Sequence, residues 1–472
     1  MFPSGMNAEE FDMIVIGGGS AGYAAARTAR ESWEKVAIID SAAELGGLCI
    51  LRGCMPSKTL IYSAEVMHLA KNGKLFGLKI PEVTADMPEM FRRKLRMVDE
   101  FQSYRQGQLL SGRFTLIRER ATFIAPDTVE LLPSGRRLTA RAFVIATGSV
   151  VNVPKIPGLD SEGIWNSDDV LDLDFLPESL VMLGGGVVAC ELAQFLQRIG
   201  CKVTLIQRGE QLLTESSETA GKIIGDVFRA EGMDVFTGTS LDSIEKTADG
   251  FRVRFQHAGG VKTIDAKHVC NALGRRANTS GIGLTAAGVE THDDGRIRVD
   301  AAQRTANPKI YAAGDVCGPF EIVHLGILQG ELAARHARGE NPSPLSYTNR
   351  TMVIFTDPQI ATAGISADEA RAAGIDVLEA EYPFDDHGKS ILMEARHGRV
   401  KIVADRKSGR MLGAECIGKD AGELIHAMAV AVTLNAKLTQ LAGVQWYHPT
   451  LAEIWSYPIE DLLEEWKTNS RN

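Results

Sequence analysis

Two glycine-rich turns, each between an apolar strand and a helix, constrain the fold of this chain more than any other feature. The first turn follows the apolar run 11–16 and contains Gly17, Gly19 and Gly22. A helix is expected over residues 23–32, and a second strand, 36–39, ends at Asp40. Glycines at this spacing let a pyrophosphate approach the helix N-terminus, and an acidic residue about 20 positions on accepts hydrogen bonds from a ribose. This pattern predicts a dinucleotide-binding unit.

The same pattern recurs later in the chain. The apolar strand 180–183 leads into Gly184 and Gly186, with an alanine in place of the third glycine, and the next strand covers 202–206. Two such units predict an α/β protein with two Rossmann-like domains and two bound dinucleotides.

The remaining segments suggest how these domains are connected. A long amphipathic stretch, 87–110, is predicted to be a helix, and Gly274 lies where the chain is expected to return to the first domain. Alternating apolar runs after residue 347 predict an antiparallel sheet with helices, a third domain of α+β type. The predicted domains are an FAD-type first part at 11–150, a nicotinamide-type unit at 151–275, a return segment at 276–346 and a C-terminal dimerisation domain at 347–465.

Cys49 and Cys54 lie five positions apart, shortly after the first dinucleotide unit. Cytosolic chains rarely keep structural disulfides, so a cysteine pair beside a βαβ unit favours redox chemistry. The alternatives are two unrelated buried cysteines or half of a zinc site. Zinc usually needs a C-x2-4-C pair and a second ligand pair like it. The other five cysteines are scattered singly, so no metal site is predicted: Cys190, Cys201, Cys270, Cys317 and Cys416.

Charge and hydropathy exclude several classes of partner. The net charge of −9, from 51 basic and 60 acidic residues, argues against nucleic acid as a main partner. The apolar stretch near the N-terminus, 13–19, is too short to span a bilayer and lacks the flanks of a signal peptide. No membrane association is expected, and the cytoplasm is the predicted location.

Six motifs then follow one another in an order that resembles the class I pyridine nucleotide–disulfide oxidoreductases, over roughly residues 11–460. This family includes dihydrolipoamide dehydrogenase, glutathione reductase and mercuric reductase. The motifs are the first G-x-G-x-x-G, the C-x4-C-x-P-S-K ending at Lys58, the Ala-Thr-Gly of Thr147 and Gly148, the second G-x-G with Glu191 after it, the Ala-Gly-Asp of Gly314 and Asp315, and the segment from His448 to Glu453.

The resemblance implies that the first unit binds FAD, the second binds a nicotinamide coenzyme, and the C-terminal domain forms a homodimer. By the same resemblance, Asp315 holds the ribityl chain of the flavin, and Lys58 pairs with Glu191 near the flavin. Thr147, Gly148, Gly274 and Gly314 are candidate cofactor contacts. Hydride would pass from the nicotinamide to the flavin, and an electron pair from there to Cys49–Cys54 and the substrate.

The residues around the cysteines suggest a division of roles. Cys54 begins a predicted helix with Pro56 in its first turn, where free backbone N–H groups and the helix dipole favour a thiolate. Lys58 adds positive charge nearby. Cys54 is therefore the candidate sulfur beside the flavin, and Cys49 is the candidate thiol that exchanges with a substrate disulfide.

His448 is the candidate proton carrier, because an imidazole titrates near working pH. Glu453 is five residues later, about 140° away on a regular helix, so helical spacing alone would not pair the two. Pro449 pushes His448 out of helical geometry, which lets it fold back toward Glu453. The resemblance further implies that this histidine serves the cysteines of the partner subunit.

The choice of coenzyme depends on the end of the strand 202–206. An NAD-binding unit normally has a carboxylate there, whereas this chain has Gln207 and Arg208. Arg208 would bind a 2′-phosphate, so NADPH is favoured over NADH. The alternative is that Arg208 points to water and Gln207 accepts either coenzyme.

The leading hypothesis is an FAD-dependent NAD(P)H:disulfide oxidoreductase most like dihydrolipoamide dehydrogenase, acting on a small disulfide or dithiol. Glutathione-type or mercuric-type NADPH-dependent reductases are the alternatives, and a flavin-bound redox sensor is the rival from another class. Leu48 and Arg52 depart from the residues usual in relatives. Arg52 is read either as a cation that acts on a thiol or an anionic substrate, or as a solvated loop residue. The substrate is not identified.

Overall fold

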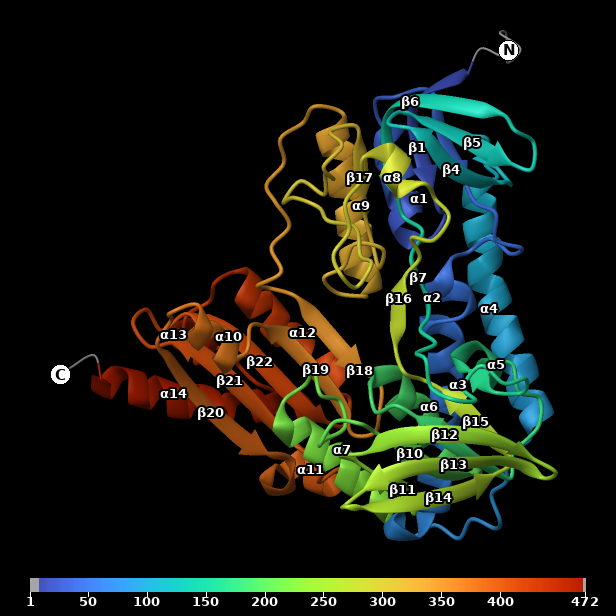
Figure 1. Ribbon diagram of the computed structural model, residues 1–472. Helices are drawn as coiled ribbons and strands as arrows, with labels where there is room; N and C mark the ends of the chain where they lie inside the picture. Colours follow the sequence, from blue (N-terminus) through green and yellow to red (C-terminus); the bar gives the residue numbers. More distant parts are fainter. Residues whose placement is uncertain (1–7, 470–472) are drawn as a thin grey trace.

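The computed structural model describes residues 8–469. Two main sheets lie on one side of the molecule, joined by a narrow two-stranded ribbon, and a third lies beside them and belongs to the C-terminal quarter of the chain (Figure 1). The two glycine-rich turns lie in the first two sheets, as the repeated pattern predicted.

The first sheet has seven strands, in the order β3-β2-β1-β6-β5-β4, with β17 paired to β6. Strands β1, β2, β3, β6 and β17 run parallel, while β4 and β5 form an antiparallel extension. Its strands are β1 (Glu9–Ile16), β2 (Val36–Ile39), β3 (Thr115–Ile117), β4 (Arg120–Ala125), β5 (Thr128–Leu132), β6 (Arg137–Ile145) and β17 (Ile310–Ala312). Strand β1 is buried from Met13 on, which is typical of a parallel strand covered on both faces.

The helices associated with this part of the chain include those that carry the candidate site. They are α1 (Ser20–Ala29), α2 (Leu48–Leu51), α3 (Cys54–Lys71), α4 (Met87–Leu109), α8 (Leu284–Ala287) and α9 (Val323–Ala337), with a 3-10 turn η1 (Gly73–Phe76). Helix α1 starts three residues before the predicted start, directly after Gly19, because the glycine turn itself feeds the helix. Helix α4 agrees with its prediction to within one residue.

The ribbon between the first two sheets consists of β7 (Ser149–Val151) and β16 (Arg275–Ala277), which pair antiparallel (Figure 1). Strand β7 leaves the first sheet just after Gly148, and β16 returns just after Gly274. The chain therefore passes into the second unit after Gly148 and returns to the first after Gly274.

The second unit is a five-stranded parallel sheet in the order β11-β10-β9-β15-β8, with a separate antiparallel three-stranded sheet, β12-β13-β14. The strands are β8 (Trp165–Asn166), β9 (Ser179–Leu183), β10 (Lys202–Ile206), β11 (Asp234–Phe236), β12 (Ser240–Thr247), β13 (Gly250–His257), β14 (Gly260–Ala266) and β15 (His268–Asn271). Its helices are α5 (Ser167–Leu171), α6 (Val187–Ile199) and α7 (Glu218–Ala230).

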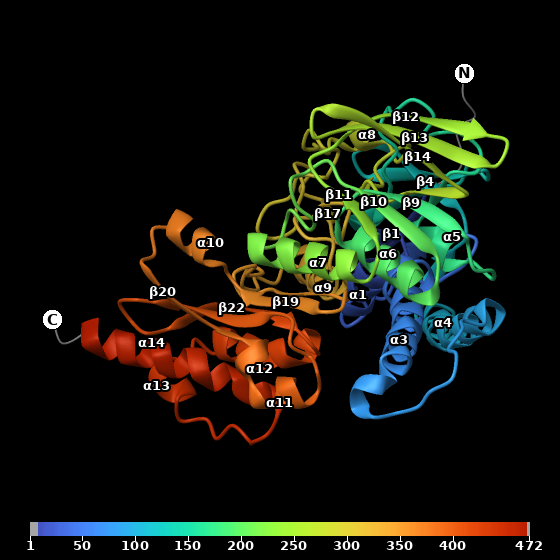
Figure 2. The same ribbon diagram turned by 90° about the horizontal axis from the view of Figure 1, so that it is seen from below.

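The C-terminal part is an antiparallel sheet in the order β18-β19-β22-β21-β20, with helices packed on it (Figure 2). The strands are β18 (Thr351–Ile354), β19 (Gln359–Gly364), β20 (Val377–Pro383), β21 (Arg399–Asp405) and β22 (Met411–Gly418). The helices are α10 (Ala367–Ala372), α11 (Gly388–Leu392), α12 (Ala421–Thr433), α13 (Leu438–Leu441) and α14 (Ser456–Asn469), with 3-10 turns η2 (Phe384–Asp386) and η3 (Leu451–Trp455). This is the α+β arrangement that the alternating runs predicted.

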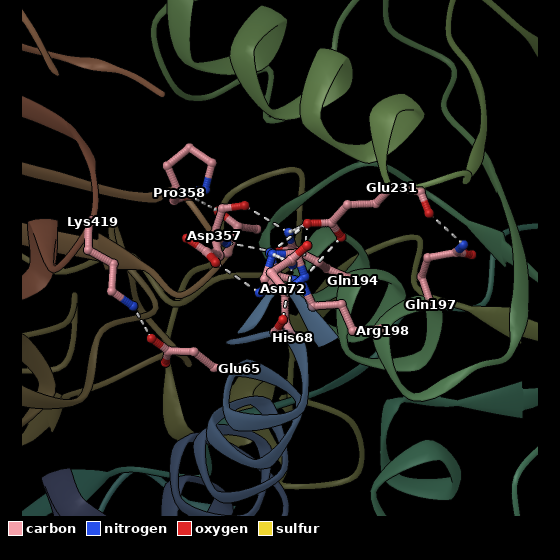
Figure 3. Close-up of polar contacts among 11 residues, drawn as sticks. Glu65, His68, Asn72, Gln194, Gln197, Arg198, Glu231, Asp357, Pro358 and Lys419 are labelled. Atoms are coloured by element: carbon pink, nitrogen blue, oxygen red, sulfur yellow. Dashed lines mark hydrogen bonds and ion pairs between the residues drawn. The ribbon is translucent and has the colours of Figure 1, made fainter. Parts of the chain in front are cut away.

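A buried polar cluster fastens the C-terminal part to the first two units (Figure 3). The guanidinium of Arg198 on α6 bonds to Glu231 and lies 2.9 Å from a carboxylate oxygen of Asp357, in the β18–β19 loop. Burial alone would lower the pKa of Arg198, but hydrogen bonding and charge from Glu231 and Asp357 outweigh it and raise the pKa. Lys71 of α3 donates to the Arg198 carbonyl at 3.0 Å. One buried cation thus connects segments far apart in the sequence.

Candidate functional site

The cysteine segment lies against the first glycine turn. Gly47, just before α2, has φ +78°, and a Cβ there would come within 2.6 Å of the Gly19 Cα atom. This close approach requires glycine at position 47, and it holds α2, which carries Cys49, beside the N-terminus of α1. Cys54 is the first residue of α3, with Gly53 as N-cap and no side chain capping the helix. The predicted helix start at Cys54 is therefore confirmed.

The two sulfurs share a hydrogen bond and have opposite acid–base properties. Both cysteines are half-buried free thiols. The hydrogen bond from Cys49 lowers the pKa of Cys54 to about 6, with Lys58 contributing further, although burial opposes the shift. The same bond, together with burial and the charge on Cys54, raises the pKa of Cys49. A proton shared by this pair thus resides on Cys49, and Cys54 holds the thiolate.

Lys58 lies one turn along α3 from Cys54 and pairs with Glu191 of α6. Its ammonium is 2.7 Å from one Glu191 oxygen, and the other oxygen accepts from the backbone N–H of Phe355 at 2.9 Å. The ammonium also lies 4.7 Å from the centre of the Phe355 ring. Glu191 is buried, so this ion pair connects three segments of the chain in a protected position. The predicted proximity of Lys58 and Glu191 is confirmed.

The first glycine turn has the features needed to hold a dinucleotide. Helix α1 has no side-chain cap, so its first amides remain available, and a Cβ on Gly19 would meet only Gly47 Cα, at 3.8 Å. Gly17 and Gly22 allow the tight turn, because a Cβ on either would overlap backbone carbonyl oxygen. Asp40 accepts from the Gly18 N–H at 2.8 Å, which places its carboxylate at the turn. These residues fit the pyrophosphate and ribose of FAD.

The residues expected to contact the rest of the flavin lie along the ribbon. Asp315, just past β17, accepts from the Ser149 hydroxyl at 2.8 Å, and that hydroxyl also accepts from Arg275 at 2.9 Å. The hydroxyl of Thr147 donates a hydrogen bond to the Asn278 carbonyl, at 2.7 Å. Gly148 and Gly314 both have positive φ, and Gly148 has open space where a Cβ would stand. The structure therefore gathers this group beside the crossover, with the hydroxyl of Thr147 engaged within the protein.

The second glycine turn has the same features. Gly184 has φ +112°, Gly186 is the N-cap of α6 without a side-chain cap, and a Cβ on Gly186 would meet no atom within 4 Å. The side chain of Gln207, after β10, lies beside the turn: a Cβ on Gly185 would be 2.9 Å from it. Arg208 is exposed, and no ion pair to it occurs in the described part of the chain. Gly274 lies at the start of the return ribbon, with φ +98°.

His448 and Glu453 lie together on the C-terminal part. Nδ1 of His448 is 3.0 Å from each carboxylate oxygen of Glu453, which sits in η3. The two side chains differ sharply in exposure: 79% for His448 and 8% for Glu453. In the described part of the chain, no polar contact joins His448 to either cysteine. The predicted fold-back of His448 onto Glu453 is confirmed, and the imidazole faces outward.

Comparison with known proteins identifies the family. Residues 11–334 match the pyridine nucleotide-disulphide oxidoreductase family, and residues 351–458 match the dimerisation domain of that family. The chain belongs to this family. It is a flavoprotein disulfide oxidoreductase whose family depends on FAD and a pyridine nucleotide, and its overall pattern is most like dihydrolipoamide dehydrogenase. The resemblance and the fold class inferred from the sequence are confirmed.

Individual relatives match over nearly the whole chain. Dihydrolipoyl dehydrogenase of Chlamydia muridarum is 35% identical over 451 residues, which cover 95% of this chain and 96% of the relative. Mercuric reductase of Bacillus cereus is 33% identical over 94% of this chain and 70% of its own length. The solved structure of LpdA from Mycobacterium tuberculosis aligns with a TM-score of 0.86 at 27% identity, covering 96% of this chain and 100% of that one. None of the described helices of this oxidoreductase is both long and apolar enough to cross a membrane.

Arg52 of this oxidoreductase has a role that neither sequence reading anticipated. Its guanidinium donates to Asp172 at 2.9 Å and lies 3.7 Å from a Glu44 oxygen. The other oxygen of Asp172 accepts from Lys94, whose side chain is almost fully buried. Arg52 therefore fastens the segment between the two cysteines to the end of α5 rather than acting as a free cation. Leu48 is the first residue of α2.

His387 was missed in the sequence. It is fully buried, and its Nε2 atom lies 3.5 Å from Oε1 of Glu453, an oxygen that also contacts His448. It sits in a polar run, 385–390, without a spacing signal that connects it to Glu453. The contact arises from tertiary packing between η2, α11 and η3, which sequence periodicity does not report.

Proposed function

We propose that this oxidoreductase moves electrons between a nicotinamide coenzyme and a small disulfide or dithiol through the Cys49–Cys54 pair. The acid–base asymmetry of the two sulfurs carries this proposal: Cys54 holds a stabilised thiolate at a helix N-terminus, while Cys49 keeps its proton. Cys54 is then the sulfur on the flavin side, and Cys49 is the exchanging thiol. When bound, FAD supplies the two-electron relay between the coenzyme and the cysteines.

His448 is proposed as the proton carrier for the exchanging thiol. Mixed-disulfide chemistry needs a base that removes a proton from the attacking thiol and an acid that protonates the leaving sulfur. Glu453 fixes the ring through Nδ1, which leaves Nε2 of His448 facing solvent. Because His448 contacts neither cysteine of its own chain, we infer that it acts on those of a partner subunit in a homodimer. The match of residues 351–458 to a dimerisation domain supports this arrangement.

NADPH is the proposed coenzyme, with NADH as the alternative. Arg208 is exposed after β10, beside the second glycine turn, and no carboxylate of the described residues pairs with it. A free guanidinium at this strand end suits a 2′-phosphate. Replacing Arg208 with Ala should raise the KM for NADPH roughly tenfold and leave that for NADH nearly unchanged. Lys202→Ala, at the exposed start of the same strand, is the matched control, and an equal effect of Arg208→Ala on both coenzymes would refute the assignment.

The substrate is proposed to be a lipoamide-like dithiol or disulfide, by analogy with the dihydrolipoyl dehydrogenase relatives. A panel of lipoamide, oxidised glutathione and Hg(II), assayed with each coenzyme, tests this choice. Turnover of lipoamide above the others supports it, and preference for glutathione or Hg(II) would replace it with one of the other reductase types. Reduction of the enzyme by coenzyme without turnover of any disulfide would favour a redox sensor instead.

A further inference from the structure

A second histidine stands behind the proposed proton carrier. Glu453 lies between the two imidazoles: both its oxygens are 3.0 Å from Nδ1 of His448, and Oε1 is also 3.5 Å from Nε2 of His387. His448 faces solvent, whereas the side chain of His387 has no exposed surface. Glu453 thus contacts one buried and one exposed imidazole.

The polar neighbours of His387 determine which of its two ring nitrogens carries the proton. Its Nδ1 lies 2.8 Å from the hydroxyl of Ser390, which is also fully buried. Burial lowers the pKa of His387, and Glu453 opposes this only partly, so the ring carries one N–H. If Ser390 donates to Nδ1, the ring proton is on Nε2, the nitrogen that lies 3.5 Å from Glu453. At 3.5 Å this contact with Glu453 is an electrostatic one, because Nε2 of His387 makes no hydrogen bond among the described residues.

We propose that His387 is a positioning residue for His448, holding the Glu453 carboxylate in the orientation in which both oxygens meet Nδ1 of His448. This role rests on the proposed function of His448 as the proton carrier. A buried carboxylate with one partner could rotate and would carry a poorly compensated charge. The Nε2 group of His387, 3.5 Å from Oε1, supplies a second polar neighbour that favours this orientation and compensates part of that charge. Nδ1 of His448 is thereby kept on the carboxylate, and Nε2 stays free.

The other polar groups near His387 have partners of their own and do not compete with its contact to Glu453. The ring of Tyr457, on α14, meets His387 edge-on with 6.2 Å between ring centres. Tyr457 stacks on Tyr382, whose hydroxyl donates to Asp386 at 2.9 Å. Asp386 is thus engaged with Tyr382, and among the described residues Glu453 is the acidic side chain in ion-pair range of His387.

The test measures the titration of His448 itself, by NMR of the ¹⁵N-histidine-labelled protein, with the resonance assigned through His448→Gln. In His387→Leu, Glu453 loses a donor, its negative potential at His448 grows, and the pKa of His448 should rise by roughly half a unit. His387→Gln restores a donor and should return the titration toward that of the unaltered protein. Ser390→Ala keeps the imidazole but frees Nδ1, and should give a smaller rise. His268→Gln, at a half-buried histidine on β15, is the control.

Kinetics supply the second readout. His387→Leu should slow disulfide turnover roughly tenfold, with flavin reduction by NADPH unchanged. A titration of His448 that is unchanged, or moves to lower pH, in both His387→Leu and Ser390→Ala overturns the proposal. If the enzyme turns over no disulfide at all, the proposed function fails, while the titration still decides whether His387 positions Glu453. If turnover needs His448 but neither readout responds to His387, this inference alone fails.

Discussion

The two parts of the proposed catalytic site, the Cys49–Cys54 pair and the His448–Glu453 pair, differ in how complete each is within one chain. At the cysteine end, Cys54 receives a hydrogen bond from Cys49 and charge from Lys58, which is itself held by buried Glu191. At the histidine end, His448 has its supporting carboxylate behind it but an open face in front, with 79% of the side chain exposed. The cysteine pair is surrounded by groups of its own subunit, whereas His448 faces outward. This difference predicts which functions a single subunit retains and which require a second.

The largest effect should come from removing the flavin-side sulfur. Cys54→Ser should reduce disulfide turnover by at least about 10³-fold, because the covalent relay is lost, while reduction of the bound flavin by NADPH continues. Stopped-flow absorbance would follow the two half-reactions separately. Cys416→Ser, at a buried cysteine on β22 of the C-terminal sheet, is a matched control that should leave both nearly unchanged. Substantial disulfide turnover in Cys54→Ser would remove the pair from the mechanism.

The second prediction tests whether His448 acts on the cysteines of a partner subunit. His448→Gln should slow disulfide turnover about 10²- to 10⁴-fold and spare flavin reduction, as expected for loss of a general acid–base. Mixing this variant with Cys54→Ser under conditions that exchange subunits creates dimers with one intact site if the site spans two chains. Activity should then recover to roughly a quarter of the unaltered level, since half of the dimers are mixed and half of their sites are intact. No recovery, with exchange verified, means that His448 serves its own chain.

The third prediction concerns the enclosed end. Half-maximal alkylation of Cys54 by iodoacetamide should occur near pH 6, its lowered pKa, against an ordinary value of 9.0. Lys58→Met removes a cation that stabilises the thiolate, so the midpoint should move up by roughly one pH unit and the thiolate fraction at pH 7 should fall. Lys74→Met, at an exposed lysine beyond the end of the same helix, should not move it. A midpoint that does not respond to Lys58 would assign the thiolate stabilisation to Cys49 and the helix alone.

Much of the enclosed end could be predicted from sequence because its signals are local. The glycine turns, the helix start at Cys54 and the strand ending at Asp40 depend on residues within one βαβ unit. The pairing of His448 with Glu453 also followed from five residues and one proline. The Lys58–Glu191 contact, in contrast, joins residues 133 positions apart and came only from the family resemblance.

What the sequence could not show depends on packing between distant segments. His387 reaches Glu453 because η2 and η3 meet in the C-terminal part, and the buried Arg198 reaches Asp357 across a unit boundary (Figure 3). Neither pair has a characteristic spacing. Trp446 and Tyr447 show the same limit at short range: the two aromatic residues are adjacent, yet Trp446 packs on the core while Tyr447 is 80% exposed. The sequence did not distinguish which of two adjacent aromatic residues points inward.

The smallest effect is expected for Arg52. Its replacement tests whether a cation near the cysteines in sequence affects the pKa of Cys54 when its own contacts are to other residues. Arg52→Gln should leave the alkylation midpoint of Cys54 nearly unchanged, because the guanidinium is engaged with Asp172 and Glu44. Both of its ion pairs are solvent-exposed, so the loss of stability should be about 0.5 kcal/mol or less, measured by urea unfolding. A shift as large as that of Lys58→Met would show that Arg52 acts directly on the thiolate. Two cations of the same subunit, Lys58 and Arg52, would then lower the pKa of Cys54, and the second of them would come from the loop between the two cysteines.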